Sequence, residues 1–170
     1  KTLLITSAFS GEGKTTTSAN LAISMARGGK TVILVDADLR RPTLDTVFGL
    51  DNSKGLTNAI VGNFSLDVAL TPTGIENLRV ITSGPVPPEP TILLRSEQMR
   101  ALMEDMVDRA DLVIFDRLEF LYITDETLVN LLVGGLNSAL VGEQQIKHLR
   151  KWVLLFYKIF FLYRTIIIDF

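Results

Sequence analysis

The chain of 170 residues is long enough to bury the core of one domain, and we expect a single domain over residues 1–170. It contains no cysteine and one histidine, which excludes disulfides, thiol nucleophiles and histidine-based triads, so any chemistry must use carboxylates, lysine, arginine and hydroxyls. The net charge of −2 gives no overall basic field, and we therefore expect no nucleic acid partner.

Short apolar runs alternate with longer helix-like stretches along the chain, which is typical of βαβ units on a mostly parallel sheet with helices on both faces. The expected strands are residues 2–6, 31–38, 77–83 and 110–116. The expected helices are residues 15–27 and 91–109, the second as one helix of about five turns. Short helices and turns are expected between residues 42 and 74. Four prolines within residues 85–90 predict a stiff loop at the edge of a site, or alternatively a polyproline ligand for a partner groove.

The C-terminal part, residues 126–170, fits this alternation less well. We expect a strand at 136–141, a helix at 143–157 and a last strand at 165–169. The apolar stretch from residue 152 onward has two alternatives, contact with a membrane or a damaged terminus. No secretory signal opens the chain, which favours a cytoplasmic protein. Because the first strand begins without a preceding methionine, we expect a fragment or an excised domain with upstream elements missing.

A phosphate-binding pattern follows the first expected strand. Residues Ala8–Thr15 match G-x-x-x-x-G-K-[ST] at every fixed position but the first, where alanine replaces glycine. Small residues there let backbone amides and the positive end of the next helix face a phosphate, with Lys14 reaching the β- and γ-phosphates and the Thr15 hydroxyl on Mg²⁺. The alternative is a glycine-rich turn that only caps a helix. The expected nucleotide-binding residues are Ser10, Gly11, Glu12, Gly13, Lys14, Thr15 and Thr16.

Aspartates follow two of the expected strands. Asp36 and Asp38 come at the end of the second strand, and Asp116 ends the strand LVIFD, as the metal-holding aspartate of a P-loop protein does. Because the carboxyl ends of parallel strands share one edge of the sheet, we expect these aspartates to converge with the P-loop. The alternative for each aspartate is a helix cap or a turn.

The motifs GEGKTT, VILVDADLRRP, LRVITSGPVPPEP and LVIFD occur in this order. From Thr2 to about Asp125 the chain therefore resembles the bacterial tyrosine kinases of capsule and exopolysaccharide assembly, a branch of the P-loop ATPases that include MinD and ParA. The segment VDADLRRP resembles the Walker A′ motif of this family. Phe9 stands where MinD-like and ParA-like ATPases carry a signature lysine, which favours the kinase branch.

The resemblance implies an α/β P-loop NTPase fold and a tyrosine autokinase with ATP and Mg²⁺ as cofactors. The metal would be held by Thr15, Asp36 and Asp116. The catalytic residues would be Lys14, Asp36, Asp38 and Asp116. Asp38 would orient or deprotonate an incoming tyrosine hydroxyl.

Partners are also implied by the resemblance. Arg40 would contact the acceptor or a neighbouring subunit. The family forms homo-oligomers and works with a membrane polysaccharide co-polymerase or activator protein. A cytoplasmic domain, associated with the membrane through this partner or through a missing N-terminal region, is the corresponding expectation.

Three features depart from the family. Arg117, Leu118 and Glu119 replace the Thr-Pro-Pro that typically follows the Walker B aspartate, a terminal tyrosine cluster is missing, and the end RTIIIDF has no clear counterpart of the family's Asn-Arg strand end. Three alternatives thus stay open: a MinD/ParA-like ATPase switch, a catalytically impaired nucleotide-binding regulator, and a defective fragment.

Overall fold

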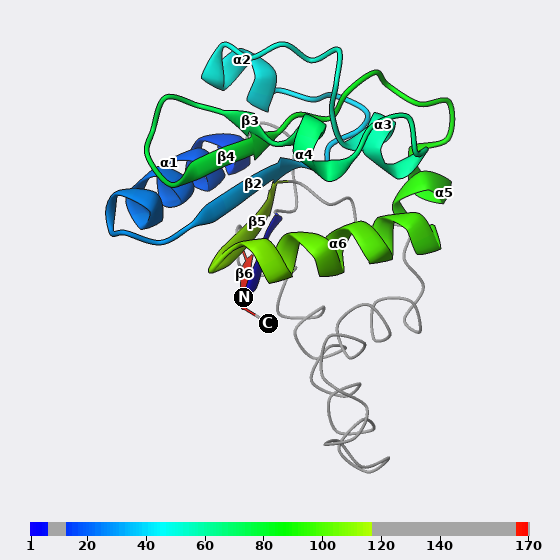
Figure 1. The fold of residues 1–170 in the computed structure, drawn as a ribbon. Helices are drawn as coiled ribbons and strands as arrows, with labels where there is room; N and C mark the ends of the chain where they lie inside the picture. The colour runs from blue at the N-terminus through cyan, green and yellow to red at the C-terminus, as the bar shows by residue number, and fades with distance from the viewer. Residues whose placement is uncertain (7–12, 117–165, 170) are drawn as a thin grey trace.

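The computed structural model describes residues 1–6, 13–116 and 166–169, and within them a six-stranded sheet has the order β3-β4-β2-β5-β1-β6 (Figure 1). Strands β1, β2, β4 and β5 run parallel, and β3 and β6 lie antiparallel at the two edges. The strands are β1 (Thr2–Thr6), β2 (Val32–Asp36), β3 (Thr71–Pro72), β4 (Leu78–Ile81), β5 (Leu112–Asp116) and β6 (Ile166–Asp169). The expectation of a mostly parallel sheet is confirmed.

Helices cover both faces of this sheet, and Figure 1 shows α1 and α6 on opposite sides of it. The helices are α1 (Lys14–Arg27), α2 (Leu44–Phe48), α3 (Leu56–Ile60), α4 (Leu66–Ala69), α5 (Pro90–Leu94) and α6 (Glu97–Arg109). Within the described residues, no helix combines the length and the apolar character needed to cross a bilayer.

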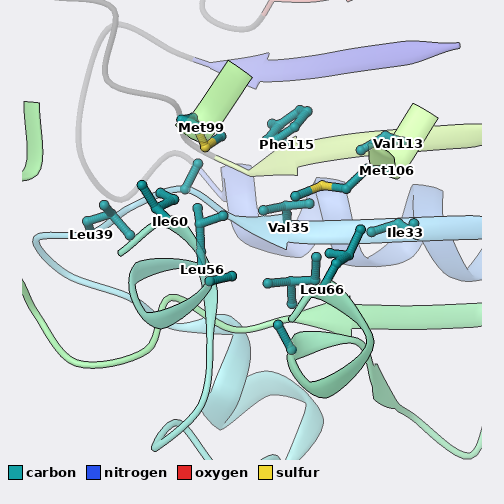
Figure 2. Packing of buried hydrophobic residues seen from close by; sticks show 14 of the residues in the cluster. Ile33, Val35, Leu39, Leu56, Ile60, Leu66, Met99, Met106, Val113 and Phe115 are labelled. Atoms are coloured by element: carbon teal, nitrogen blue, oxygen red, sulfur yellow. The ribbon is translucent and has the colours of Figure 1, made fainter. Parts of the chain in front are cut away.

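Two apolar clusters form the core, one on each face of the sheet. In β2, Ile33 and Val35 belong to the cluster that also contains residues of α3, α4 and α6 (Figure 2). Val32 and Leu34 alternate with them and pack with α1 on the other face. Successive side chains of a strand point to opposite faces, so a strand buried on both sides needs an unbroken apolar run. This explains the composition of VILVD and LVIFD.

The expectation of one helix over residues 91–109 is wrong, because the chain forms α5 and α6 with a break at Ser96. The Ser96 hydroxyl accepts a hydrogen bond from the Met99 backbone N–H (3.2 Å) and donates one to the Leu93 carbonyl oxygen (2.7 Å). A serine hydroxyl that caps the next helix competes with continuation of the previous one. The apolar positions keep helical spacing across the break, so periodicity alone did not reveal it.

The segment between residues 42 and 74 contains the expected short helices, α2, α3 and α4, and also β3, an edge strand of two residues that was not predicted. The expected strand at 165–169 corresponds to β6, which pairs with β1. The expected elements at 136–141 and 143–157 and the altered segment 117–119 lie outside the described residues.

The loop after β4 is fixed against the start of α3 by backbone contacts. The N–H groups of Leu56 and Thr57 donate to the carbonyl oxygens of Thr82 (2.7 Å) and Ser83 (2.8 Å). A Cβ atom on Gly55 would lie 2.2 Å from the Gly84 nitrogen, so only glycine permits this approach. The proline-rich segment therefore starts from a fixed position beside the carboxyl edge of the sheet.

Candidate functional site

The N-terminus of α1 has the features of an anion site. Gly13 precedes the helix with a φ of +79°, a left-handed conformation that glycine adopts without strain. The first turn of α1 contains no acidic side chain, and the positive end of a helix favours an anion. Lys14 is the first helical residue and is buried, Thr15 is half-buried and Thr16 is exposed. The predicted residues Ser10, Gly11 and Glu12 lie outside the described residues.

Asp36 and Asp116 lie at adjacent carboxyl ends of the central strands. They are direct partners in the parallel pairing of β2 with β5, and both are fully buried. The ladder continues one residue further, where the Ala37 N–H donates to the Asp116 carbonyl oxygen (3.0 Å). The fold therefore brings together two of the carboxylates that the sequence analysis singled out.

The Asp36 carboxylate accepts hydrogen bonds from the loop that follows it. Its Oδ2 atom accepts from the N–H groups of Thr43 (3.0 Å) and Leu44 (2.9 Å), and its Oδ1 atom accepts from the N–H of Asp38 (3.2 Å). Burial raises the pKa of Asp36 to about 7, the charge of Asp116 adds to this shift, and the three N–H groups oppose it. A cation bound near Asp36 would favour its charged form.

Asp38 is buried and fixes the next turn of the same loop. Its Oδ1 atom accepts hydrogen bonds from the N–H groups of Arg40 (3.2 Å) and Arg41 (2.9 Å). These are the contacts of a turn-forming aspartate, so the alternative of a turn applies to this residue. The Arg40 side chain is exposed. The catalytic role of Asp38 and the contact role of Arg40 stay predictions.

Two hydroxyl residues at this site were not singled out from the sequence. The buried Ser18 hydroxyl lies within hydrogen-bonding distance of Asp116 Oδ1 (2.7 Å) and of the Lys14 carbonyl oxygen (2.9 Å). The Thr43 hydroxyl lies 3.2 Å from the Thr15 hydroxyl. Ser18 could have been found, because it follows Lys14 by four residues and so shares its helix face. No sequence signal identifies Thr43, because its contact depends on the path of the loop after β2.

The donor set fits magnesium bound together with a nucleotide. Asp36, Asp116 and Thr15 offer carboxylate and hydroxyl oxygens, the ligand type that Mg²⁺ prefers. In residues 1–6, 13–116 and 166–169, no three Asp, Glu, His or Cys side chains gather as an all-protein metal site would require. Magnesium usually takes one or two carboxylates and completes its shell with phosphate oxygens and water. The residues present match that mode of binding.

Comparison with known proteins identifies the family. The model of the CobQ/CobB/MinD/ParA nucleotide binding domain matches residues 3–159. The chain belongs to this family. The structure of the septum site-determining protein MinD from Pyrococcus horikoshii OT3, complexed with Mg-ADP, superimposes with a TM-score of 0.58 at 28% identity, over 68% of this chain and 49% of MinD. The expectation of a P-loop NTPase fold is confirmed.

Relatives named as tyrosine kinases match the chain as well. Tyrosine-protein kinase YwqD of Bacillus subtilis (strain 168) is 43% identical over 135 residues, which cover 79% of this chain and 57% of YwqD. The kinase domain of the Escherichia coli tyrosine kinase ETK superimposes with a TM-score of 0.68 at 35% identity, over 75% of this chain and 49% of that one. The resemblance to bacterial tyrosine kinases is confirmed, and the chain spans little more than half the length of YwqD.

Proposed function

We propose that this domain binds ATP with Mg²⁺ and transfers the γ-phosphoryl group to a tyrosine hydroxyl of a protein. The observation that supports this most is the pairing of the buried Asp36 and Asp116 at the carboxyl edge of the sheet, together with a helix N-terminus suited to an anion. YwqD and ETK are named tyrosine kinases, and MinD was solved with Mg-ADP.

In this proposal the metal is held by Thr15, Asp36 and Asp116. Two buried carboxylates side by side repel each other, and a divalent cation held by them would offset that repulsion. The bound metal supplies neutralisation of charge on the phosphates. Lys14 and the amides at the start of α1 bind the phosphates. The residues therefore serve mainly to position the reactants, which is what phosphoryl transfer requires.

Asp38 is the proposed acceptor of the tyrosine proton. The bond between the γ-phosphorus and its bridging oxygen breaks, a bond from phosphorus to the tyrosine oxygen forms, ADP leaves, and the proton passes to the carboxylate. Hydrogen bonds from the N–H groups of Arg40 and Arg41 to Oδ1 keep this carboxylate in place. A carboxylate suffices as a base, because transfer depends more on positioning than on base strength.

The partners of the reaction are also proposals. By family resemblance we propose a homo-oligomer that acts in capsule or exopolysaccharide assembly, with a membrane polysaccharide co-polymerase or activator protein as partner. The cytoplasmic domain would reach the membrane through that partner. The exposed Arg40 is proposed to contact the acceptor or a neighbouring subunit.

The test is incubation of the chain with labelled ATP, Mg²⁺ and a tyrosine-rich peptide supplied in trans. We expect phosphotyrosine on the peptide. Lys14→Met should abolish ATP binding or turnover, because the phosphates lose their cation. Asp38→Asn should retain the Oδ1 acceptor for the two N–H groups, and so retain ADP affinity, while phosphoryl transfer falls because the amide cannot take the proton.

Other outcomes separate the alternatives. Hydrolysis of ATP without phosphotyrosine would favour a MinD/ParA-like switch. Binding of nucleotide without turnover would favour an impaired regulator, and replacement of Arg117, Leu118 and Glu119 by Thr-Pro-Pro should then restore activity if that segment is the cause. Undiminished activity of Lys14→Met would remove the P-loop assignment.

A further inference from the structure

Thr43 joins two residues of the proposed metal site through two different atoms. Its backbone N–H donates to Asp36 Oδ2 at 3.0 Å, and its hydroxyl oxygen lies 3.2 Å from that of Thr15. The two threonines are 28 residues apart in sequence, one in the first turn of α1 and the other immediately before α2. One residue thus links the helix after the P-loop to the loop after β2.

The Thr43 hydroxyl is not used for the task that a threonine at this position usually performs. Thr43 is the N-cap of α2, and an N-cap hydroxyl normally accepts a hydrogen bond from a backbone N–H in the first turn. Among the described residues the Thr43 side chain makes no such bond. The N–H groups of Thr43 and Leu44, which precede the donors that such a hydroxyl would cap, are bound by the Asp36 carboxylate. The Thr43 hydroxyl can therefore face Thr15.

The direction of the bond between the two threonines follows from metal binding. A hydroxyl that coordinates a cation uses a lone pair for the metal, and its proton must then be donated to another acceptor. For Thr15 the Thr43 hydroxyl oxygen stands within reach of that proton. Donation to Thr43 fixes the rotation of the Thr15 hydroxyl and leaves its lone pairs for the ion.

We propose that Thr43 is a positioning residue for the magnesium ion of a bound Mg-nucleotide. It accepts the proton of the Thr15 hydroxyl and, through its own N–H, holds the Asp36 carboxylate. This inference rests on the proposed function, because it assumes that Thr15 and Asp36 bind the ion. Partners that orient metal ligands commonly change metal affinity by about 10- to 100-fold when they are removed.

The test compares Thr43→Val, which removes the hydroxyl and keeps both the shape and the N–H, with Thr43→Ser, which keeps the hydroxyl. ADP affinity is measured by titration calorimetry with and without Mg²⁺, and the affinity of the ADP complex for Mn²⁺ is measured by electron paramagnetic resonance. For Thr43→Val we expect about tenfold weaker Mn²⁺ binding, with unchanged affinity for ADP alone. Thr43→Ser should behave as the unmodified chain does.

Thr46→Val is the matched control, because Thr46 is an exposed residue of the same short helix. It should leave both affinities unchanged. Since the Thr15 and Thr43 hydroxyls meet near the surface, the melting temperature without ligands should change little in Thr43→Val; if that variant does not fold, Thr43→Ala removes the hydroxyl without adding bulk.

Three results would overturn the proposal: equal Mn²⁺ affinity in Thr43→Val and the unmodified chain, loss of affinity in Thr43→Ser, or an equal loss in Thr46→Val. Failure of the unmodified chain to bind Mg²⁺ with ADP would instead reject the function on which the proposal rests.

Discussion

The carboxyl ends of β2 and β5 have the same sequence design, an apolar run that ends in aspartate, but the two aspartates are held in different ways. Asp36 is held by N–H groups of Asp38, Thr43 and Leu44, all within eight residues of it. Asp116 contacts the hydroxyl of Ser18, which is 98 residues away in sequence. The first position is therefore set by the local chain, and the second depends on the packing of α1 against β5.

This difference has a functional consequence. The loop after β2 cannot change its path without releasing the Asp36 carboxylate, so the proposed acceptor side of the site and the proposed metal side are coupled through the backbone. The contact described for the Asp116 carboxylate is with Ser18, on the helix that also bears Lys14. The following predictions test whether the two aspartates really differ in this way.

The largest effect is expected from pH, through Asp36. The pKa of Asp36 is raised from its ordinary value of 3.8 to about 7 in the folded chain. Between these two pH values the folded state therefore keeps a proton that the unfolded state has lost. The free energy of unfolding contributed by this group is therefore highest below pH 4, falls as pH rises, and is fully lost above about pH 7. The decrease amounts to at most about 4 kcal/mol.

Urea denaturation between pH 4 and pH 8 without nucleotide measures this decrease, and the same series on Asp36→Ala is the reference that isolates the contribution of Asp36. Asp116→Asn removes the neighbouring charge and should reduce the decrease only in part, because burial is the main cause of the shift. A stability difference between the chain and Asp36→Ala that does not vary with pH would contradict this account of Asp36.

Substitution of each aspartate by alanine should show which of the two holds the loop after β2 in place. In Asp36→Ala the N–H groups of Asp38, Thr43 and Leu44 lose their acceptor, so their hydrogen exchange should become faster, whereas Asp116→Ala should leave these three amides protected. Both variants should lose phosphoryl transfer by about 10²- to 10³-fold, because both remove charge from the proposed metal site. Amide exchange followed by NMR and a peptide phosphorylation assay measure these effects.

Amide exchange in the loop after β2 distinguishes how the two aspartates are held, even if neither variant shows activity. Equal acceleration of these amides in both variants would mean that the two aspartates support one common structure. Protection retained in Asp36→Ala would mean that the loop after β2 does not depend on this carboxylate.

The smallest effect is expected from Ser18→Ala, which removes a buried hydroxyl 2.7 Å from Asp116 Oδ1. Loss of a hydrogen bond to a buried carboxylate should lower the free energy of unfolding by about 1–3 kcal/mol. Ser24→Ala, at an exposed position of the same helix, should be close to neutral. Urea denaturation of both variants checks this. A Ser18→Ala variant as stable as Ser24→Ala would show that α1 does not support Asp116.

The sequence predicted the features that are encoded locally. The apolar runs located β1, β2, β4 and β5 within a few residues, because strands buried on both faces have an unmistakable composition. Parallel strands implied that Asp36 and Asp116 would meet at one edge, and they do.

Features that depend on one side chain or on the path of a loop were missed. The break at Ser96 depends on a single hydroxyl within a pattern that otherwise continues. The contact between Thr15 and Thr43 depends on where the loop after β2 runs, which spacing in sequence does not specify. The two-residue β3 is too short to produce a period-two pattern.

A crystal structure of the chain with ADP and Mn²⁺, in which anomalous scattering locates the metal, tests the central claim most directly. The account predicts the metal within coordination distance of the Thr15 hydroxyl and at the Asp36 and Asp116 carboxylates, directly or through one water, with the phosphates of ADP at the N-terminus of α1. A metal bound away from both aspartates, or a nucleotide bound elsewhere on the sheet, would contradict it.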